Sequence, residues 1–251
     1  MLREVVLYYF SPTGGTKKAG DMFCKGFAEK VVEQDFMKNI EENVNSEVAV
    51  FAAPVFGGRI PDFVTNKMKK ICGKGKKAVT LAVYGTRAYE DALLELNDTA
   101  EMCGFQVIAS AAVIAQHSMV PSVGAGRPDL ADQAELLSFA KAVLDKLEKQ
   151  DDNKIEVPGQ YPYKNHMTVV AAPFSNESCD KCGVCAEICP TGAIQITDEQ
   201  VESTLEKCIL CMACVSHCPT KCRMLIPAMQ ASINERLGAL KDIRRENEFF
   251  I

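Results

Sequence analysis

The first 150 residues alternate between short continuous apolar runs and longer segments in which apolar residues recur at helical spacing. Continuous apolar runs are typical of strands that are covered on both faces, as in a parallel sheet. We expect strands at residues 4–10, 47–53, 77–84 and 105–115, and a weaker one near 35–40. We expect helices at residues 17–33, 62–71, 90–103 and 130–149. This alternation predicts an α/β fold built on a parallel sheet.

A turn rich in hydroxyl groups and glycine, residues 11–16, joins the first strand to the first helix. Free backbone amides, the positive end of a helix dipole and serine or threonine hydroxyls together make a site for an anion such as a phosphate. The turn contains neither a GxxxxGK[ST] nor a GxGxxG motif. The alternative interpretation is a helix cap, with Ser11 or Thr16 at the N-cap position.

Glycine-containing loops also follow the three later strands, at residues 54–61, 84–89 and 116–129. Open parallel sheets bind ligands at the carboxyl ends of their strands. The loop 116–129 is longer than a simple connection needs, and such loops are often functional. Within it, His117 is a candidate proton donor and Arg127 a candidate anion ligand. A histidine that is solvated or caps a helix is the alternative for His117.

The second half of the chain contains the pattern CxxCxxCxxxCP twice, at residues 179–190 and 208–219. Three thiols within seven residues converge on one place, whereas disulfide partners lie across a fold, so these cysteines are expected to be metal ligands. The chain has twelve cysteines, and its first residues lack the charged leader and cleavage site of a signal peptide. We therefore expect a reducing compartment, the cytoplasm.

The repeated cysteine pattern resembles the two-cluster bacterial ferredoxins, in which three cysteines of each run hold one [4Fe–4S] cluster and the fourth crosses to the other. The resemblance implies one cluster on Cys179, Cys182, Cys185 and Cys218. It implies the other on Cys208, Cys211, Cys214 and Cys189. Residues 192–196 match the short strand that follows the first run in ferredoxins. After the second run, Cys222 breaks the symmetry and is either a buried thiol or an alternative ligand.

The turn at residues 11–16 resembles the phosphate loop of flavodoxins, which holds the phosphate of FMN, and it matches at Ser11, Thr13, Gly14 and Thr16. The resemblance implies a flavodoxin-like sheet of strand order 2-1-3-4-5, with the loops at Phe56 and Tyr89 bracketing the flavin ring. The implied FMN-binding residues are Ser11, Thr13, Gly14, Gly15, Thr16, Pro54, Val55, Phe56, Gly57, Gly58, Arg59, Tyr84, Gly85, Thr86, Arg87 and Tyr89. Arg59 is a candidate for the N1/O2 edge of the flavin, or else a surface residue.

The whole chain resembles the flavodoxin–ferredoxin fusion proteins of anaerobes. The resemblance implies a flavodoxin-like domain at 1–150, a linker or docking strip at 151–174, a small α+β ferredoxin domain with two clusters at 175–224, and a helix packed at the domain junction at 225–251. Residues 168–174 are apolar enough for a strand or an ordered strip.

Two functions remain open from the sequence. The first is an electron-transfer protein that moves electrons between FMN, its two [4Fe–4S] clusters and redox partner proteins, such as a ferredoxin or an oxidoreductase. The second is an FMN-dependent reductase of a small-molecule acceptor such as a quinone, with His117 and Arg127 in catalytic roles. Clusters with only a structural or sensing role are disfavoured by the complete second set of ligands. Electron transfer within one chain and across a homodimer are both possible.

Composition excludes other classes of protein. With 47% hydrophobic and 24% charged residues, the chain has the composition of an ordinary folded protein. The formal net charge is −5 and basic clusters contain only two or three residues, which argues against nucleic acid as a partner. No run approaches 18 apolar residues, so no membrane span is expected.

Overall fold

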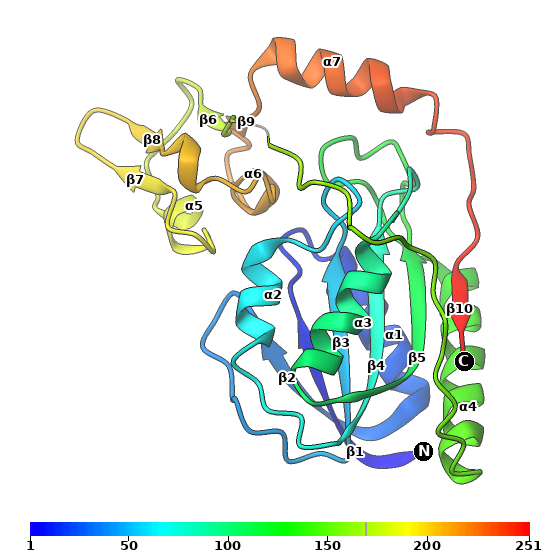
Figure 1. Ribbon diagram of the computed structural model, residues 1–251. Coiled ribbons are helices and arrows are strands. Elements are labelled where there is room, and N and C mark those ends of the chain that lie inside the picture. The colour runs from blue at the N-terminus through cyan, green and yellow to red at the C-terminus, as the bar shows by residue number, and fades with distance from the viewer. Residues whose placement is uncertain (169) are drawn as a thin grey trace.

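The computed structural model describes residues 1–168 and 170–251. Its centre is a six-stranded sheet (Figure 1). In spatial order the strands are β10 (Glu248–Phe250), β5 (Gln106–Ile114), β4 (Lys77–Tyr84), β3 (Val48–Pro54), β1 (Leu2–Tyr9) and β2 (Ala28–Asp35). β1 to β5 pair in parallel, so the predicted α/β fold and the strand order 2-1-3-4-5 are confirmed.

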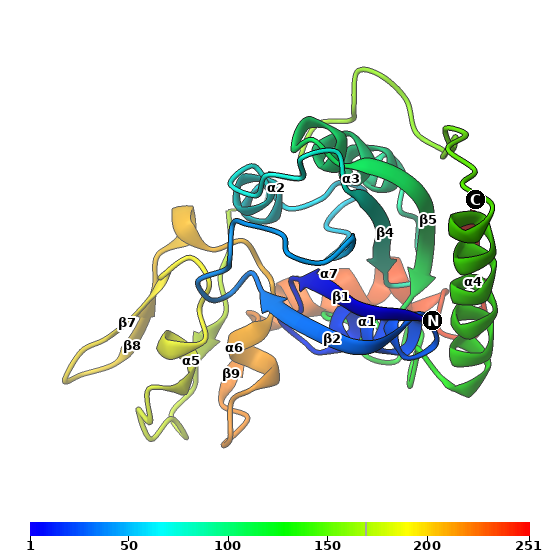
Figure 2. The same cartoon turned by 90° about the horizontal axis from the view of Figure 1, so that it is seen from below.

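Helices cover both faces of this sheet (Figures 1 and 2). On one face, α1 (Gly15–Phe27) packs against α4 (Leu130–Glu148), with Phe23, Phe27 and Phe139 in a shared core. On the other face lie α2 (Asp62–Met68) and α3 (Ala92–Met102), over a core that includes Phe51 and Phe105. Burial on both faces explains why these strands are continuous apolar runs in the sequence.

The expected first helix and second strand are corrected by the structure. The helix ends at Phe27, and Ala28 is extended. Residues 28–35 then form β2, beside β1, with Val5 opposite Val31. The helix expected to reach residue 33 and the strand expected near 35–40 were therefore wrong. β-branched Val31 and Val32 suit a strand, and pairing with the edge of β1 decided a segment whose apolar spacing was also compatible with a helix.

No sequence pattern predicted β10, which adds the C-terminus of the chain to the sheet. β10 pairs antiparallel with β5. Phe249 packs on Phe139 of α4, with their ring centroids 4.8 Å apart. The final residues thus cover an edge of the sheet that would otherwise present unpaired backbone groups.

A smaller module carries the cysteines (Figure 2). Its elements are β6 (Phe174–Ser175), α5 (Val184–Glu187), β7 (Ile194–Ile196), β8 (Val201–Ser203), a 3-10 turn (Leu205–Lys207), α6 (Ala213–Ser216) and β9 (Arg223–Met224). β6 pairs with β9 and β7 with β8, both antiparallel. The short β7 lies within the segment 192–196 that was expected to be a strand.

Residues 150–168 have no helix or strand but dock on α3 through polar contacts. The carboxylate of Asp91 accepts hydrogen bonds from the backbone N–H groups of Gln160 and Lys164, at 3.1 and 2.7 Å. Asp98 accepts from the hydroxyls of Tyr161 and Tyr163. Of the strip expected at 168–174, residue 169 lies outside the described residues.

The C-terminal helix α7 (Pro227–Gly238) contacts both parts of the molecule. Ile233 and Leu237 share an apolar cluster with Val120 and Val123 of the loop 116–129 and with Met212 beside α6. After α7 the chain returns to the sheet and ends in β10 (Figure 1). The chain after the cysteine module therefore holds that module against the sheet domain.

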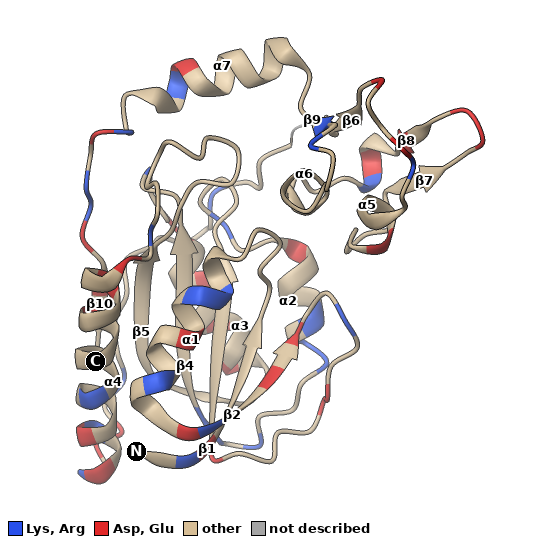
Figure 3. Cartoon of the chain, turned by 180° about the vertical axis from the view of Figure 1, so that it is seen from behind, with Lys and Arg blue, Asp and Glu red and all other residues tan. Residues whose placement is uncertain are grey.

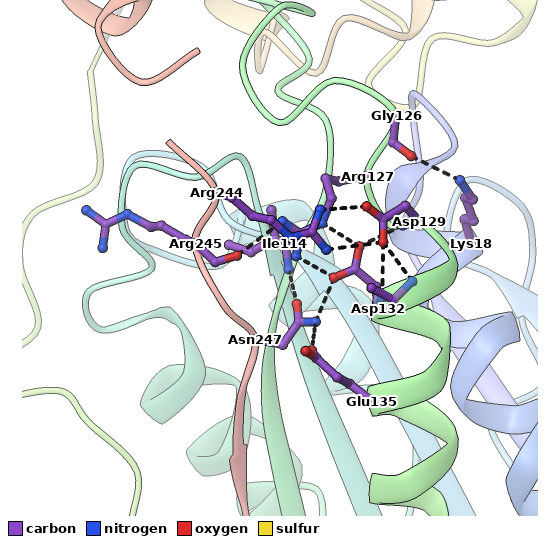
Figure 4. Close-up of polar contacts among 11 residues, drawn as sticks. Lys18, Ile114, Gly126, Arg127, Asp129, Asp132, Glu135, Arg244, Arg245 and Asn247 are labelled. Atoms are coloured by element: carbon purple, nitrogen blue, oxygen red, sulfur yellow. Dashed lines mark hydrogen bonds and ion pairs between the residues drawn. The ribbon is translucent and has the colours of Figure 1, made fainter. Parts of the chain in front are cut away.

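A buried polar network anchors this return (Figure 4). The guanidinium of Arg127 forms a bidentate ion pair with Asp132, and both side chains are buried. Asn247 donates to Asp132 at 2.8 Å and accepts from the backbone N–H of Ile114 at 2.8 Å. Asp132 thus neutralises a buried cation and also holds the residue just before β10.

Replacing Asp132 with asparagine should destabilise the protein strongly, because the Arg127 guanidinium then stays buried without a counter-charge. Breaking a buried pair in this way costs about 3–5 kcal/mol. The matched control is Asp129→Asn, which removes the exposed pair with Arg244 but keeps a good N-cap residue on α4. That loss should be below about 1 kcal/mol. Thermal unfolding followed by circular dichroism measures both, and equal losses would contradict the assignment.

Candidate functional site

A pocket of about 480 Å³ opens at the carboxyl ends of β1, β3, β4 and β5. The first loop contributes Pro12, Thr13, Gly15 and Thr16 to its lining. The ends of β3 and β4 contribute Pro54, Val55, Phe56, Val83, Tyr84 and Gly85. The loop after β5 adds Ala115, Gln116, His117 and Ser118, and the cysteine module adds Cys211. Four loops that are far apart in the sequence therefore meet at one edge of the sheet, as its parallel order requires.

The first loop combines a helix cap with part of the pocket lining. Ser11 Oγ accepts the backbone N–H of Lys17 at 2.8 Å. Gly14 is the N-cap of α1 and has φ of +91°, a conformation that glycine adopts readily. Ser11 and Gly14 thus shape the turn, while Thr13, Gly15 and Thr16 line the pocket. Both interpretations of residues 11–16 hold, for different residues.

Two aromatic and basic candidates lie away from the pocket lining. Arg59 is buried, pairs with Glu95 through Nε at 2.8 Å and Nη2 at 2.7 Å, and stacks over the ring of Tyr163. Tyr89 donates its hydroxyl to Glu248 of β10 at 2.7 Å. These contacts assign Arg59 to the docking of residues 150–168, and Tyr89 to the docking of the C-terminus.

The remaining candidates of these loops also lie outside the lining. A Cβ on Gly58 would lie 1.8 Å from Glu90 Oε2, so Glu90 requires glycine there. Gly57 has φ of +62° and lies against Met167. Arg87 pairs with Glu90 at 3.0 Å. Thr86 is fully buried, and its hydroxyl has no partner among the described residues.

The two candidate catalytic residues are separated by the fold. Arg127 is committed to its buried pair with Asp132 and does not line the pocket, so the anion-binding role is corrected. His117 lines the pocket and packs against Gly85, where an added Cβ would lie 2.6 Å from His117 Cδ2. Its Nδ1 accepts the backbone N–H groups of Met119 and Val120, each at 3.2 Å. This geometry fixes the neutral tautomer with the proton on Nε2.

Several lining residues were not identified from the sequence as candidates: Pro12, Val83, Ala115, Gln116 and Ser118. Each adjoins a residue that was identified, or begins the loop 116–129. Their exposure to the pocket depends on the direction of each strand end, which periodicity does not specify.

Four cysteines line a second cavity, of about 360 Å³, in the cysteine module. They are Cys189, Cys208, Cys211 and Cys214, the set that the ferredoxin resemblance implied for one cluster. Cys189 comes from the first repeat and the other three from the second. Four thiols around one cavity fit an iron–sulfur cluster, whose ligands surround a core of several atoms.

The environment of these thiols favours a bound cation. Burial raises the pKa of Cys211 to about 12, and burial likewise raises the pKa values of Cys208 and Cys214. A free thiolate is therefore disfavoured in this cavity, whereas a metal centre stabilises the thiolate form.

The second implied ligand set lies around Cys222. Cys218 Sγ and Cys222 Sγ are 3.4 Å apart, and both side chains are buried. Cys179 also contacts Cys222 through a side-chain hydrogen bond. Cys222 thus lies beside ligands from both repeats. Across residues 1–168 and 170–251, no three His, Cys, Asp or Glu side chains are close enough together to bind a single metal ion.

The pocket and the cysteine cavity share one residue, Cys211. Cys211 and the neighbouring Ala213 belong to the same apolar core cluster as Phe10 and Phe51 of the sheet domain, against which Phe56 packs. A cofactor in the pocket and a cluster on Cys211 would therefore be neighbours within one chain.

Comparison with known proteins supports this division of the chain. Residues 178–228 match the model of the 4Fe–4S dicluster domain. The chain joins a flavodoxin-like fold to a 4Fe–4S domain. Within the second part, 43 residues are 46% identical to a component of the ion-translocating oxidoreductase complex of Methanosarcina acetivorans. This match covers 17% of the chain and only 16% of that relative.

Solved structures similar to the chain align with somewhat over half of it. Rubredoxin:oxygen oxidoreductase from the anaerobe Desulfovibrio gigas aligns with 59% of the chain and 36% of its own length, at 17% identity and a TM-score of 0.44. A flavodoxin from the domain Archaea aligns with 58% of the chain and 99% of its own length, at 13% identity and a TM-score of 0.41. In residues 1–168 and 170–251, no helix is long and apolar enough to cross a bilayer.

His117 should make the stability of the protein depend on pH. Burial, and to a smaller extent Arg87 and Arg236, lower the pKa of His117 below its ordinary value of 6.5. The unfolded chain therefore takes up this proton first as pH falls, and the stability that neutral His117 provides is lost below about pH 6.5.

The non-titrating variant His117→Asn tests this expectation, because its side-chain oxygen can still accept from the two backbone N–H groups. The fall in Tm between about pH 7.5 and about pH 5.5 should be smaller in His117→Asn than in the natural protein. The same comparison with His217→Asn serves as the control. An unchanged pH dependence in His117→Asn would show that His117 does not titrate as assigned.

Proposed function

We propose that this protein transfers electrons between redox partner proteins and FMN through two [4Fe–4S] clusters in its own chain. The observation that carries the proposal is that Cys211 lines both the cysteine cavity and the pocket at the sheet edge. A cluster on Cys211 would be adjacent to a cofactor in the pocket. No second copy of the chain is then needed for electrons to pass between them.

The lining of the pocket fits FMN. Thr13, Gly15 and Thr16 lie at the start of α1, where hydroxyls, free amides and the helix dipole can hold the phosphate. Phe56 and Tyr84 provide aromatic surface for a ring, and Gly85 leaves the chain accessible between them. FMN exchanges electrons singly or in pairs, whereas a [4Fe–4S] cluster exchanges one at a time. The protein would thus couple one-electron and two-electron partners.

The cysteine module suits contact with a partner protein. Residues 175–224 contain seven acidic and four basic residues. Acidic side chains occupy the outward loop between β7 and β8 (Figure 3). Charge of one sign guides association with a partner that carries the opposite charge, so we propose a redox protein with a basic docking face. All twelve cysteines are free thiols, as the reducing cytoplasm would keep them.

The second candidate function is reduction of a small-molecule acceptor such as a quinone. The position of His117 in the pocket favours it, because the Nδ1 contacts with Met119 and Val120 leave a proton on Nε2. In this function His117 would donate that proton to the acceptor.

The cofactor content tests the proposal directly. The anaerobically purified protein should contain about eight irons and release FMN on denaturation. Cys208→Ala should lose about half of the iron, because Cys208 lines the cavity of one cluster only. Cys103→Ala, a thiol at the end of α3 outside the cysteine module, should lose none. About four irons in the natural protein, or no flavin, would contradict the corresponding half of the proposal.

Reoxidation of the reduced protein distinguishes the two functions. The protein is reduced anaerobically and mixed with acceptors in single-turnover absorbance measurements. An electron carrier should be reoxidised rapidly by redox proteins, at a rate that falls as ionic strength rises. An enzyme should be reoxidised rapidly by a quinone, and His117→Asn should slow that step by about 10²-fold or more. Quinone reoxidation at an unchanged rate in His117→Asn would rule out this role of His117.

A further inference from the structure

Arg223 is a buried cation in the wall of the cysteine cavity. It begins β9 and lies opposite Ser175 of β6, with 2% of its surface exposed. It lines the same cavity as Cys189, Cys208, Cys211 and Cys214. No role was assigned to it from the sequence, where it only follows the irregular residue Cys222.

The guanidinium of Arg223 is held rigidly by neutral acceptors. Nη2 donates to the carbonyl of Pro173 at 2.8 Å and to Ser203 Oγ at 2.7 Å, and Nη1 donates to Ser175 Oγ at 3.2 Å. Nη2 also lies 3.9 Å from Cys214 Sγ, within N–H···S distance. Nε is buried and has no hydrogen-bond partner among the described residues.

The protein treats its other two buried arginines differently. Arg59 is paired with Glu95 and Arg127 with Asp132, each through two hydrogen bonds to the carboxylate. Among the ion pairs of the described residues, none involves Arg223. A buried charge is costly unless a counter-charge compensates it. Thiolate ligands and a cluster with net negative charge would provide that compensation at this cavity.

We propose that Arg223 sets the reduction potential of the cluster held by Cys189, Cys208, Cys211 and Cys214. The inference rests on the proposed function, because it requires that cluster to be present. Reduction adds one electron to the cluster, and a fixed positive charge next to a ligand sulfur stabilises the more negative state. The N–H···S contact with Cys214 acts in the same direction, since hydrogen bonds to ligand sulfur and net charge both tune such potentials. Arg223 therefore raises the potential of this cluster.

This assignment distinguishes the two clusters. Among the described residues, the only sulfur that hydrogen-bonds to the Arg223 side chain belongs to Cys214, a ligand of the cluster next to the pocket. That cluster becomes the better electron acceptor of the two. Electrons that enter at the cluster of Cys179, Cys182, Cys185 and Cys218 are then drawn toward Cys211 and the pocket.

The test is an anaerobic redox titration of the holoprotein, with each cluster followed by electron paramagnetic resonance. Arg223→Gln removes the charge but keeps a side-chain donor. It should make reduction of the Cys214 cluster at least tenfold less favourable, a fall of about 59 mV for a one-electron couple. Arg223→Lys keeps the charge and should hold the potential nearer to that of the natural protein. Lys221→Gln, which removes an exposed charge two residues away, is the matched control and should leave the potential unchanged.

The possible results separate the inference from the proposed function. A natural protein that lacks this cluster would contradict the proposed function itself. Both clusters present, with the same potential in Arg223→Gln as in the natural protein, would overturn only the role of Arg223. If Arg223→Gln does not retain its iron, Arg223→Lys decides. A tenfold less favourable reduction in the lysine variant would assign Arg223 to packing and hydrogen bonding, whereas a retained potential would support the charge effect.

Discussion

Backbone hydrogen bonding in the parallel sheet is the constraint on which the rest of this structure depends. Because β1, β3, β4 and β5 run in the same direction, their carboxyl ends meet at one edge, and the four loops that follow them must lie together there. The cysteine module reaches this same edge through Cys211. Two sites that are separate in the sequence thereby become neighbours.

Holding the module at that edge uses contacts on both sides of it in the sequence. Before the module, residues 150–168 dock on α3 through Asp91, Asp98 and the stacked pair of Arg59 and Tyr163. After it, α7 packs on the loop 116–129, and the chain then ends as β10 in the sheet. Buried ion pairs such as Arg127 with Asp132 fix these crossings, because an unpaired charge at such a position would be strongly destabilising. The module is thus fastened at both ends, which favours a constant separation between the two sites.

Much of the fold followed from local pattern, and the exceptions have identifiable causes. Continuous apolar runs located β1, β3, β4 and β5, because both faces of these strands are buried. The segment 28–35 was ambiguous, since Val31 and Val32 suit a strand but also continued the helical spacing of α1. Only pairing with β1 resolved it. Residues 248–250 carried no strand signal, because three residues at a chain end become a strand only when the edge of β5 is available.

For the sites, the sequence by itself determined the chemistry: eight cysteines at ligand spacing, a hydroxyl-rich turn before a helix, and glycine-containing loops after strands. Spacing specifies such features because the residues concerned are close along the chain. Only the tertiary structure decided which candidates share a cavity. It placed His117 and Phe56 in the pocket, paired Arg59 and Arg127 with carboxylates elsewhere, and put Arg223 beside Cys214. These are contacts between distant segments, and their geometry depends on how the whole chain packs.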